Sequence, residues 1–358
     1  MNTPSPFSHS LSPSLAASMV DALKANDIAV VIPCYRVEKQ IRWVVEHIPN
    51  YVRYIIAVND ASPDATPEIL ANLAHELKGK LIVVSHQVNQ GVGGAMMTGY
   101  RTALQHGAKI IVKIDGDGQM NPRLLPFFVW PLVRGEAEYV KGNRFQNLAD
   151  SAEMPKLRRL GNLGLSFLIR AASGYWNVSD PTNGYTAISS ALARRLDFAK
   201  LEKRYLFESN LLVHAYFARA RVIQVPMRAK YGEEGSSLEI RRIFFQLSLA
   251  LVKWLFIRIF RTYFWNDFNV VSVFLFFGTL MTTFGLTFGA YSWIHFATEG
   301  IPATAGTVML AAMPVLLGLE FLINALVLDV QNVPSSPPFL EDSIFADEIR
   351  GGEETFAP

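Results

Sequence analysis

The spacing of apolar residues divides the chain into two parts. From residue 28 to about residue 225, short runs rich in Val and Ile alternate with helix-like segments of mixed polarity. Runs that are apolar throughout are typical of strands buried on both faces. The alternation predicts an α/β fold with a mostly parallel sheet and helices on both sides. The expected strands are Ile28–Ile32, Tyr54–Val58, Leu81–Val84 and Ile110–Ile114, and the expected helices are Val37–His47, Thr66–Leu77 and Gly93–His106.

The second part consists of two long apolar stretches, Phe268–Phe296 and Pro302–Leu328. A membrane-spanning helix needs about 20 apolar residues, and both stretches are longer. They therefore predict two transmembrane helices in preference to a pair of buried core helices. Glu320 lies inside the second stretch, where we expect a carboxylate to face a partner helix or to be protonated, and not to face lipid.

Basic residues near the first stretch predict its orientation. Lys253, Arg258 and Arg261 precede it, whereas the link at residues 297–301 contains Glu299 and no Lys or Arg. Positive residues remain on the cytoplasmic side of short loops. The sequence therefore predicts an integral membrane protein whose large domain and both termini are cytoplasmic.

Composition changes along the chain and predicts five regions. Residues 1–26 are expected to form a Ser/Pro-rich disordered tail and a short helix, and residues 27–238 the α/β domain. Residues 239–266 mix Arg and Lys with Phe, Trp and Leu, which predicts interfacial amphipathic helices that contact membrane lipid, either one or two. Residues 267–330 contain the two spans, and residues 331–358 an acidic disordered cytoplasmic tail.

Net charge and cysteine content bear on two points, nucleic-acid binding and disulfide formation. The formal net charge is only +2, which gives no support to nucleic-acid binding. Cys34 is the single cysteine, so no internal disulfide can form. A lone thiol fits a reducing compartment.

The strongest chemical signal is the segment Asp115-Gly116-Asp117-Gly118-Gln119, directly after an expected strand. Two carboxylates one residue apart at a strand end can share a hard divalent cation, and Gln119 offers a third oxygen. Such a cation would also hold a diphosphate and stabilise its charge as it leaves. The alternative is a polar turn, because Asp and Gly are common turn residues.

Three other expected strands also end in polar or Gly-rich loops. Because the strands are parallel, these loops meet at the edge of the sheet where ligands of such folds bind. Asp60 could accept a hydrogen bond from a nucleobase, and the glycines allow close approach of backbone to a ligand. The segments are Ile32-Pro33-Cys34-Tyr35 with Glu38, Asn59-Asp60-Ala61-Ser62, and Asn89-Gln90-Gly91.

These motifs resemble the GT-A catalytic domain of the family 2 inverting glycosyltransferases. Within that family, the chain is most similar to polyprenyl-phosphate glycosyltransferases and dolichyl-phosphate mannosyltransferases. The resemblance covers about Ile28 to Leu238, and the two C-terminal spans match the bacterial members. The further motifs that carry it are Gly142-Asn143-Arg144-Phe145 and Ser179-Asp180-Pro181 before Gly184-Tyr185.

The resemblance implies a fold, a reaction and partners. The fold is a Rossmann-like, mostly parallel sheet, followed by interfacial helices and two transmembrane helices. The reaction is the inverting transfer of a monosaccharide from a UDP- or GDP-sugar to a polyprenyl phosphate, undecaprenyl or dolichyl. The implied cofactor is Mg²⁺ or Mn²⁺, and the implied assembly is a homo-oligomer associated through the spans.

The resemblance also assigns roles to matching positions. The residues implied for the nucleotide-sugar donor are Pro33, Tyr35, Glu38, Asp60, Asn89, Gly91, Asp115 and Lys230. The implied metal ligands are Asp115, Asp117 and Gln119. The residues implied for the acceptor phosphate are Arg144, Arg158 and Asn162, with Arg159 as an alternative to Arg158. The implied catalytic residues are Asp117, Arg144 and Asp180.

Elementary chemistry narrows the role of Asp180. A phosphate monoester has a second pKa near ~6 and is largely ionised at neutral pH. Such a nucleophile needs little help from a general base. We therefore expect Asp180 to position the acceptor or the sugar and not to take a proton.

The sequence departs from the family pattern at a few positions and leaves other functions open. Asn59 and Asn162 replace a common Asp and Ser, and Gly116 and Gly118 replace a common Ala and Leu, so the sugar is not indicated. Two alternatives are the same fold acting on a non-phosphorylated lipid and an inactive membrane scaffold. A dinucleotide-binding site is disfavoured because Met96 stands where its third glycine is needed.

Overall fold

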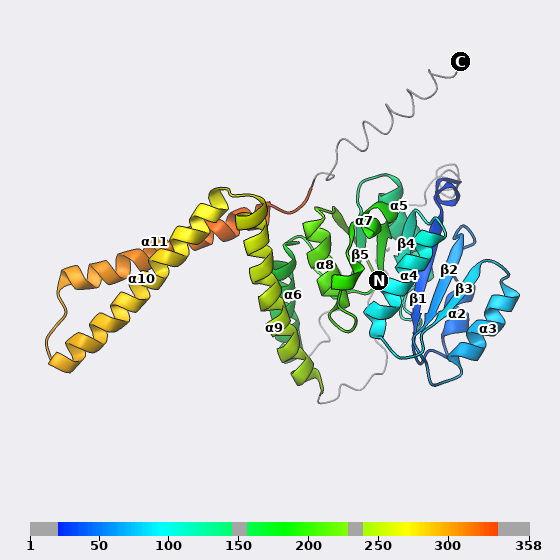
Figure 1. Ribbon diagram of the computed structural model, residues 1–358, viewed down its shortest axis with the longest axis horizontal. Helices are drawn as coiled ribbons and strands as arrows, with labels where there is room; N and C mark the ends of the chain where they lie inside the picture. The colour runs from blue at the N-terminus through cyan, green and yellow to red at the C-terminus, as the bar shows by residue number, and fades with distance from the viewer. Residues whose placement is uncertain (1–20, 145–155, 228–238, 336–358) are drawn as a thin grey trace, which may run out of the picture.

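A mixed sheet of seven strands forms the centre of the α/β domain (Figure 1). The computed structural model describes residues 21–144, 156–227 and 239–335. The strand order is β3-β2-β1-β4-β6-β5-β7. Strand β6 is antiparallel to both of its neighbours, and the other pairs are parallel. The strands are β1 (Ile28–Cys34), β2 (Tyr54–Asn59), β3 (Leu81–Ser85), β4 (Ile110–Lys113), β5 (Tyr139–Asn143), β6 (Thr186–Ser189) and β7 (Val222–Pro226).

The mostly parallel sheet and its four expected strands are confirmed, with ends that differ by one or two residues. The helices of this domain are α2 (Ile41–Glu46), α3 (Thr66–Glu76), α4 (Gly91–Gln105), α5 (Leu125–Val133), α6 (Lys156–Ser173), α7 (Ser190–Arg195) and α8 (Phe207–Phe217), with short 3-10 turns η1 (Pro122–Leu124) and η2 (Phe198–Lys200).

Strand β1 shows why these runs are apolar throughout. Ile28, Val30 and Ile32 enter the core beneath α2, α3 and α5, whereas Ala29 and Val31 enter the core beneath α4 and α8.

The first helix begins later than the sequence predicts. The expected helix spans Val37–His47, whereas α2 begins at Ile41. The backbone N–H of Val37 donates to Thr66 Oγ1, and that of Glu38 donates to Asp64 Oδ2. Asp64 and Thr66, just before and at the start of α3, therefore bind backbone N–H groups of the loop after β1, and the helix begins only at Ile41. Apolar periodicity cannot reveal such a contact between distant segments.

Helix α9 (Glu239–Phe260) joins the α/β domain to the apolar C-terminal helices and continues into a π-helical turn, η3 (Arg261–Asn266). The sequence predicted either one or two helices here, and the structure has one long helix. One side packs against α6 through buried Leu251 and Trp254. The opposite side exposes a row of apolar side chains, which we call the α9 stripe: Leu249, Val252, Phe256 and Phe260.

Helices α10 (Val270–Glu299) and α11 (Ala305–Gln331) form a hairpin that projects away from the sheet (Figure 1). Both are long and apolar enough to cross a membrane, and they lie within a few residues of the expected spans. In the most apolar window of each helix, only 22% and 11% of the residues are buried. Their apolar side chains therefore face outward, unlike those of a core helix in a soluble protein.

The hairpin packs through small residues. A Cβ atom at Gly318 would lie 2.4 Å from Oγ1 of Thr282 on the facing helix, so only glycine allows this approach. Small residues at such contacts let helix backbones come close together in membranes. Glu320, by contrast, is exposed on the outside of the hairpin and does not face α10.

Candidate active site

A cavity of about 820 Å³ opens at the carboxyl ends of the parallel strands. This edge is where open α/β sheets bind their ligands, and the volume suits a ligand of drug size or larger. The loops after β1, β2, β3 and β4 all contribute, as the sequence predicts. Predicted site residues that line the cavity are Pro33, Tyr35, Asp60, Asn89, Gly91, Asp115, Asp117, Gln119 and Arg144.

The acidic motif after β4 forms part of the cavity wall. Asp117 Oδ1 accepts the backbone N–H of Gln119 at 2.9 Å, which holds the turn in shape. Asp115 Oδ1 is paired with the Lys113 ammonium at 2.9 Å, and the Asp115 side chain is still 28% exposed and lines the cavity. A carboxylate that faces a polar cavity in this way fits a cation ligand.

The donor set matches a cation that also binds substrate. In the part of the chain that the structure describes, no three His, Cys, Asp or Glu side chains gather as a complete metal site. Mg²⁺ is commonly held by one or two carboxylates, with the remaining ligands supplied by water and substrate phosphates. Asp115, Asp117 and Gln119 fit that arrangement.

Lys113 lies beneath the acidic motif and is almost completely buried. Its ammonium lies 2.9 Å from Asp115 Oδ1 and 2.9 Å from Glu208 Oε1. Burial alone would lower the pKa of Lys113, but the two carboxylates outweigh it, so the pKa is raised and the amine remains charged. A Cβ atom at Gly184 would lie 2.7 Å from the Lys113 Nζ, so this glycine leaves room for the cluster.

Asp60 joins the loop after β2 to the start of α4. Its Oδ1 accepts the backbone N–H of Gln90 at 2.8 Å and lies 2.7 Å from His86 Nδ1. Its Oδ2 accepts the backbone N–H of Gly91 at 2.8 Å. A carboxylate has about four acceptor positions, so the three contacts do not exhaust its capacity. Gly91 has a φ of +83°, and a Cβ there would lie 2.6 Å from the Lys203 carbonyl oxygen.

Glu38 is not among the cavity-lining residues, although the resemblance implies a role in donor binding. Its Oε2 accepts the backbone N–H of Ala65 at 3.0 Å. The contact holds the loop after β1 against the loop after β2. Glu38 therefore supports the loop that lines the cavity and does not line it itself.

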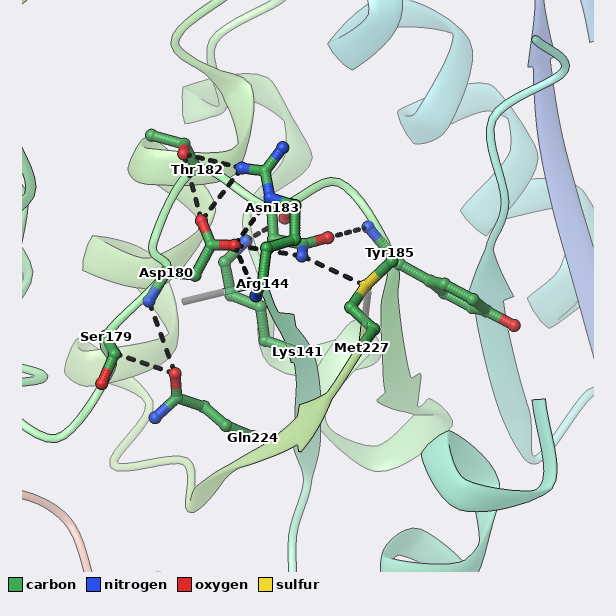
Figure 2. A network of polar contacts seen from close by, with 9 residues as sticks. All are labelled: Lys141, Arg144, Ser179, Asp180, Thr182, Asn183, Tyr185, Gln224 and Met227. Carbon is green, nitrogen blue, oxygen red and sulfur yellow. Dashed lines mark hydrogen bonds and ion pairs between the residues drawn. The ribbon is translucent and has the colours of Figure 1, made fainter. Parts of the chain in front are cut away.

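A second charged feature of the cavity is Arg144, at the end of β5. Figure 2 shows its guanidinium lying against the Asp180 carboxylate, with Nε donating to Oδ2 at 2.8 Å and Nη2 to Oδ1 at 3.0 Å. The backbone N–H of Arg144 also donates to Oδ2, at 3.1 Å. The bidentate pair fixes the plane of the guanidinium. Arg144 lines the cavity and its side chain is 33% exposed, so it can meet a ligand.

Asp180 lies behind Arg144 and has no exposed surface. Thr182 Oγ1 and Asn183 Nδ2 donate further hydrogen bonds to its carboxylate, at 3.3 and 3.2 Å (Figure 2). Burial would raise the pKa of Asp180, but the hydrogen bonds and charge of Arg144 outweigh it and lower the pKa. An ionised, buried and saturated carboxylate is suited to hold an arginine and unsuited to accept a proton from a substrate.

The sequence profile of glycosyl transferase family 2 matches residues 29–197. A UDP-N-acetylglucosamine–dolichyl-phosphate N-acetylglucosaminyltransferase of Methanococcus voltae is 34% identical over 218 residues, which are 58% of this chain and 86% of the relative. The chain belongs to glycosyl transferase family 2.

Other comparisons agree with this family. An undecaprenyl-phosphate mannosyltransferase of Micrococcus luteus is 29% identical over 184 residues, 51% of this chain and 74% of the relative. Glucosyl-3-phosphoglycerate synthase of Mycobacterium tuberculosis, solved with Mn²⁺, UDP-glucose and phosphoglyceric acid, has a TM-score of 0.51 and 23% identity over 67% of this chain and 83% of that structure. That likeness shows the fold, which is GT-A. The family match and the Methanococcus voltae relative show that the protein is a glycosyltransferase.

Three predicted site residues of this glycosyltransferase cannot be placed against the cavity. Lys230 lies outside the described residues. Arg158 and Asn162 lie on the first two turns of α6, whose backbone is described while their side chains are not. Their roles at the acceptor phosphate stay predictions.

Sequence reasoning missed Lys113 and Glu208, which both line the cavity of this glycosyltransferase. A signal existed for Lys113, because a lysine in an apolar strand that precedes an acidic motif requires a buried partner. No signal existed for Glu208, which lies 95 residues further along the chain. Only the packing of α8 near β4 brings the two together.

Proposed function

We propose that this glycosyltransferase transfers a monosaccharide from a nucleotide-sugar to a polyprenyl phosphate at the cytoplasmic face of a membrane, with inversion at the anomeric carbon. The relatives from Methanococcus voltae and Micrococcus luteus are named for dolichyl and undecaprenyl phosphate. The product would be a polyprenyl-phosphate monosaccharide.

One observation carries the proposal: a single cavity holds both an acidic pair and a fixed guanidinium. Asp115 and Asp117 lie after β4, and Arg144 lies at the end of β5. A carboxylate pair suits a cation with its diphosphate, and a planar guanidinium suits a second phosphate. Transfer to a phosphate acceptor needs two anionic groups held on either side of one sugar carbon.

A divalent cation, Mg²⁺ or Mn²⁺, would be held by Asp115, Asp117 and Gln119. When bound, it stabilises the negative charge that develops on the departing diphosphate. The solved relative with Mn²⁺ and UDP-glucose supports this assignment. Lys113 keeps Asp115 in place beneath the cavity and provides additional positive charge.

The residues of the chain then act by positioning. Arg144 would hold the acceptor phosphate so that one of its oxygens faces the anomeric carbon. That oxygen forms the new bond, the bond from the anomeric carbon to the donor diphosphate breaks, and its electron pair leaves with the nucleoside diphosphate. The attacking phosphate is already ionised, so no proton needs to be removed. Asp180 keeps Arg144 oriented.

The membrane-facing parts support the lipid acceptor. The α9 stripe is exposed and apolar, which suits a helix lying in the membrane interface. Exposed Lys253 on the same helix and exposed Arg261 at the start of η3 suit lipid phosphates. With these bases inside, the catalytic domain and both ends of the chain lie in the cytoplasm.

Among donors, we propose UDP-N-acetylglucosamine first, because the Methanococcus voltae relative is named for it. UDP-glucose and GDP-mannose are the next candidates. Three features of the site could discriminate sugars: Lys113, Glu208 and Asn183 line the cavity near the acidic motif.

A transfer assay tests the proposal. The full-length protein in detergent is given radiolabelled UDP- or GDP-sugars, undecaprenyl or dolichyl phosphate, and Mg²⁺, Mn²⁺ or a chelator. Label is expected in the lipid phase only with metal, and Asp117→Asn is expected to lower the rate about 10²–10³-fold. The matched control is Asp197→Asn, which makes the same change at an exposed aspartate shortly after α7.

The other outcomes each point elsewhere. Hydrolysis of a donor without labelled lipid would reject the polyprenyl phosphate acceptor and favour another lipid. Failure to bind or turn over every donor would reject catalysis and favour a membrane scaffold.

A further inference from the structure

A second buried charge cluster does not line the cavity and lies where the hairpin meets the catalytic domain. Asp329, in the last turn of α11, is buried. Its Oδ1 accepts from Arg258 Nη1 and from the Tyr263 hydroxyl, both at 2.6 Å. Its Oδ2 accepts from Arg258 Nη2 and from Trp176 Nε1, both at 2.9 Å. Four donors saturate the carboxylate.

Arg258 links this carboxylate to the catalytic domain. The guanidinium is 1% exposed, and its Nε donates to the backbone oxygen of Ala171 on α6 at 3.0 Å. The guanidinium also lies 5.4 Å from the ring centre of Tyr216 on α8. One arginine of α9 therefore contacts α6, α8 and α11. We call Arg258, Asp329, Tyr263 and Trp176 the joint.

The chemistry of the joint indicates a role in geometry. A buried ion pair contributes little net stability, because apolar side chains of similar volume do as well. A fully satisfied network of short, directional hydrogen bonds instead selects one arrangement of the elements that carry it. The joint therefore fixes the angle of α9 and α6 relative to the end of α11.

That angle determines what the catalytic domain presents to the membrane. With α9 fixed, the α9 stripe faces away from α6 and toward the side where lipid is expected. Helix α6 runs from Ala171 at the joint to Lys156, where it carries Arg158 near its start. Its 18 residues span about 27 Å. A tilt of about 10° at the joint would move the far end by about 5 Å, whereas about 1 Å can matter in catalysis.

We propose that the Arg258–Asp329 pair is a positioning element that holds the catalytic domain at a set tilt over the bilayer, so that the cavity meets the phosphate of a membrane-embedded acceptor. The inference rests on the proposed function. Neither residue touches substrate. The pair acts on capture of the lipid acceptor and not on donor binding or on the chemical step.

The test compares two acceptors with the full-length protein reconstituted in phosphatidylethanolamine/phosphatidylglycerol vesicles. One acceptor is undecaprenyl phosphate in the same bilayer, and the other is a water-soluble short-chain prenyl phosphate. The variants are Asp329→Asn and Arg258→Lys, which preserve volume. The matched controls are Glu320→Gln, an exposed carboxylate of the same helix, and Arg194→Lys, an exposed arginine of α7.

For both joint variants, the apparent KM for undecaprenyl phosphate is expected to rise about tenfold or more, because the cavity no longer meets the bilayer correctly. The KM for the donor and the rate with the soluble acceptor are expected to stay as in the wild type. The two controls are expected to match the wild type with both acceptors.

Three results would overturn the inference. An equal loss with both acceptors would make the pair a general stability element and not a positioning element. An unchanged KM for undecaprenyl phosphate would remove its role in positioning. If the wild-type protein used neither phosphate acceptor, the proposed function itself would fail, a result distinct from a selective loss in the variants.

Discussion

Two arginine–aspartate pairs in this protein are both bidentate, but they use different guanidinium nitrogens and have opposite surroundings: Arg144 binds through Nε and Nη2, and Arg258 through Nη1 and Nη2. Arg144 and Asp180 meet through two hydrogen bonds of 2.8 and 3.0 Å, and Arg258 and Asp329 meet through two of 2.6 and 2.9 Å. In both pairs the aspartate is buried. The arginines differ, because the Arg144 side chain is 33% exposed in the cavity and that of Arg258 is 1% exposed.

The partners of the two carboxylates differ as well. Asp180 is also bound by Thr182 and Asn183, two and three residues away, so two of its hydrogen-bond donors come from its own loop. Asp329 is bound from segments between 66 and 153 residues away. The comparison teaches that a bidentate arginine–aspartate pair can present a guanidinium to a ligand or hold separate elements together. Which of these it does depends on how much of the arginine remains accessible.

The largest expected effect is a loss of stability when one residue of the buried pair is replaced. Arg258→Met leaves Asp329 buried without a countercharge, and breaking such a pair costs about 3–5 kcal/mol. The double variant Arg258→Met/Asp329→Leu is expected to recover most of that loss, because apolar side chains then fill the space. Thermal unfolding in detergent, followed by intrinsic fluorescence, measures both. A double variant as unstable as the single one would contradict the account of the joint.

The next effect concerns Arg144. Arg144→Lys keeps the charge but loses the planar fork that matches a phosphate. Transfer to polyprenyl phosphate is expected to fall about 10²-fold, with a higher KM for the acceptor. Donor affinity, measured by calorimetry, is expected to stay unchanged. A fall in donor affinity that equals the fall in transfer would place Arg144 at the donor instead.

A smaller effect distinguishes Asp180 by pH. Its pKa is lowered in the folded protein, so the ionised carboxylate stabilises the fold above its unfolded pKa of about 3.9. This contribution is lost as the pH falls through the folded-state pKa. The thermal midpoint of the wild type is therefore expected to exceed that of Asp180→Asn at pH 7, and the difference is expected to shrink below about pH 4. A difference that persists at the lowest pH would show that ionisation is not the cause. Asp21→Asn, at an exposed aspartate, is the control.

The smallest effect is expected at an exposed pair with the same fork geometry. Arg42 donates to both carboxylate oxygens of Glu76 at 3.0 Å, and both side chains are about half exposed. Water and ions screen such a pair. Arg42→Met is expected to leave both the thermal midpoint and the transfer rate unchanged. A clear loss in either would mean that bidentate geometry matters without burial or a ligand.

Much of the fold and site could be predicted because the relevant signals are local. Val- and Ile-rich runs predicted the four parallel strands, and parallel strands bring their carboxyl ends to one edge. That rule correctly gathered Tyr35, Asp60, Gly91 and Asp117 around one cavity. Two long apolar stretches predicted the hairpin.

The sequence drew attention to the wrong carboxylate in the hairpin. Glu320 stands out in an apolar stretch, yet it is exposed on the outside of α11. Asp329, near the end of the stretch, is the buried and fully bonded acid. Arg258 was counted among the basic residues that predict the orientation of the first span, yet it is buried against Asp329. Position in a hydrophobic stretch does not reveal which charges find partners from other segments.

The sequence by itself determined the family, the parallel sheet, the cavity edge and the apolar hairpin, because these depend on neighbouring residues and on their periodicity. Tertiary structure alone decided that Asp180 holds Arg144, that Lys113 meets Glu208 and that Arg258 meets Asp329. Each of these contacts joins residues at least 36 positions apart. A buried charge is stable only beside its partner, and the partner is chosen by how helices and strands pack and not by any local pattern.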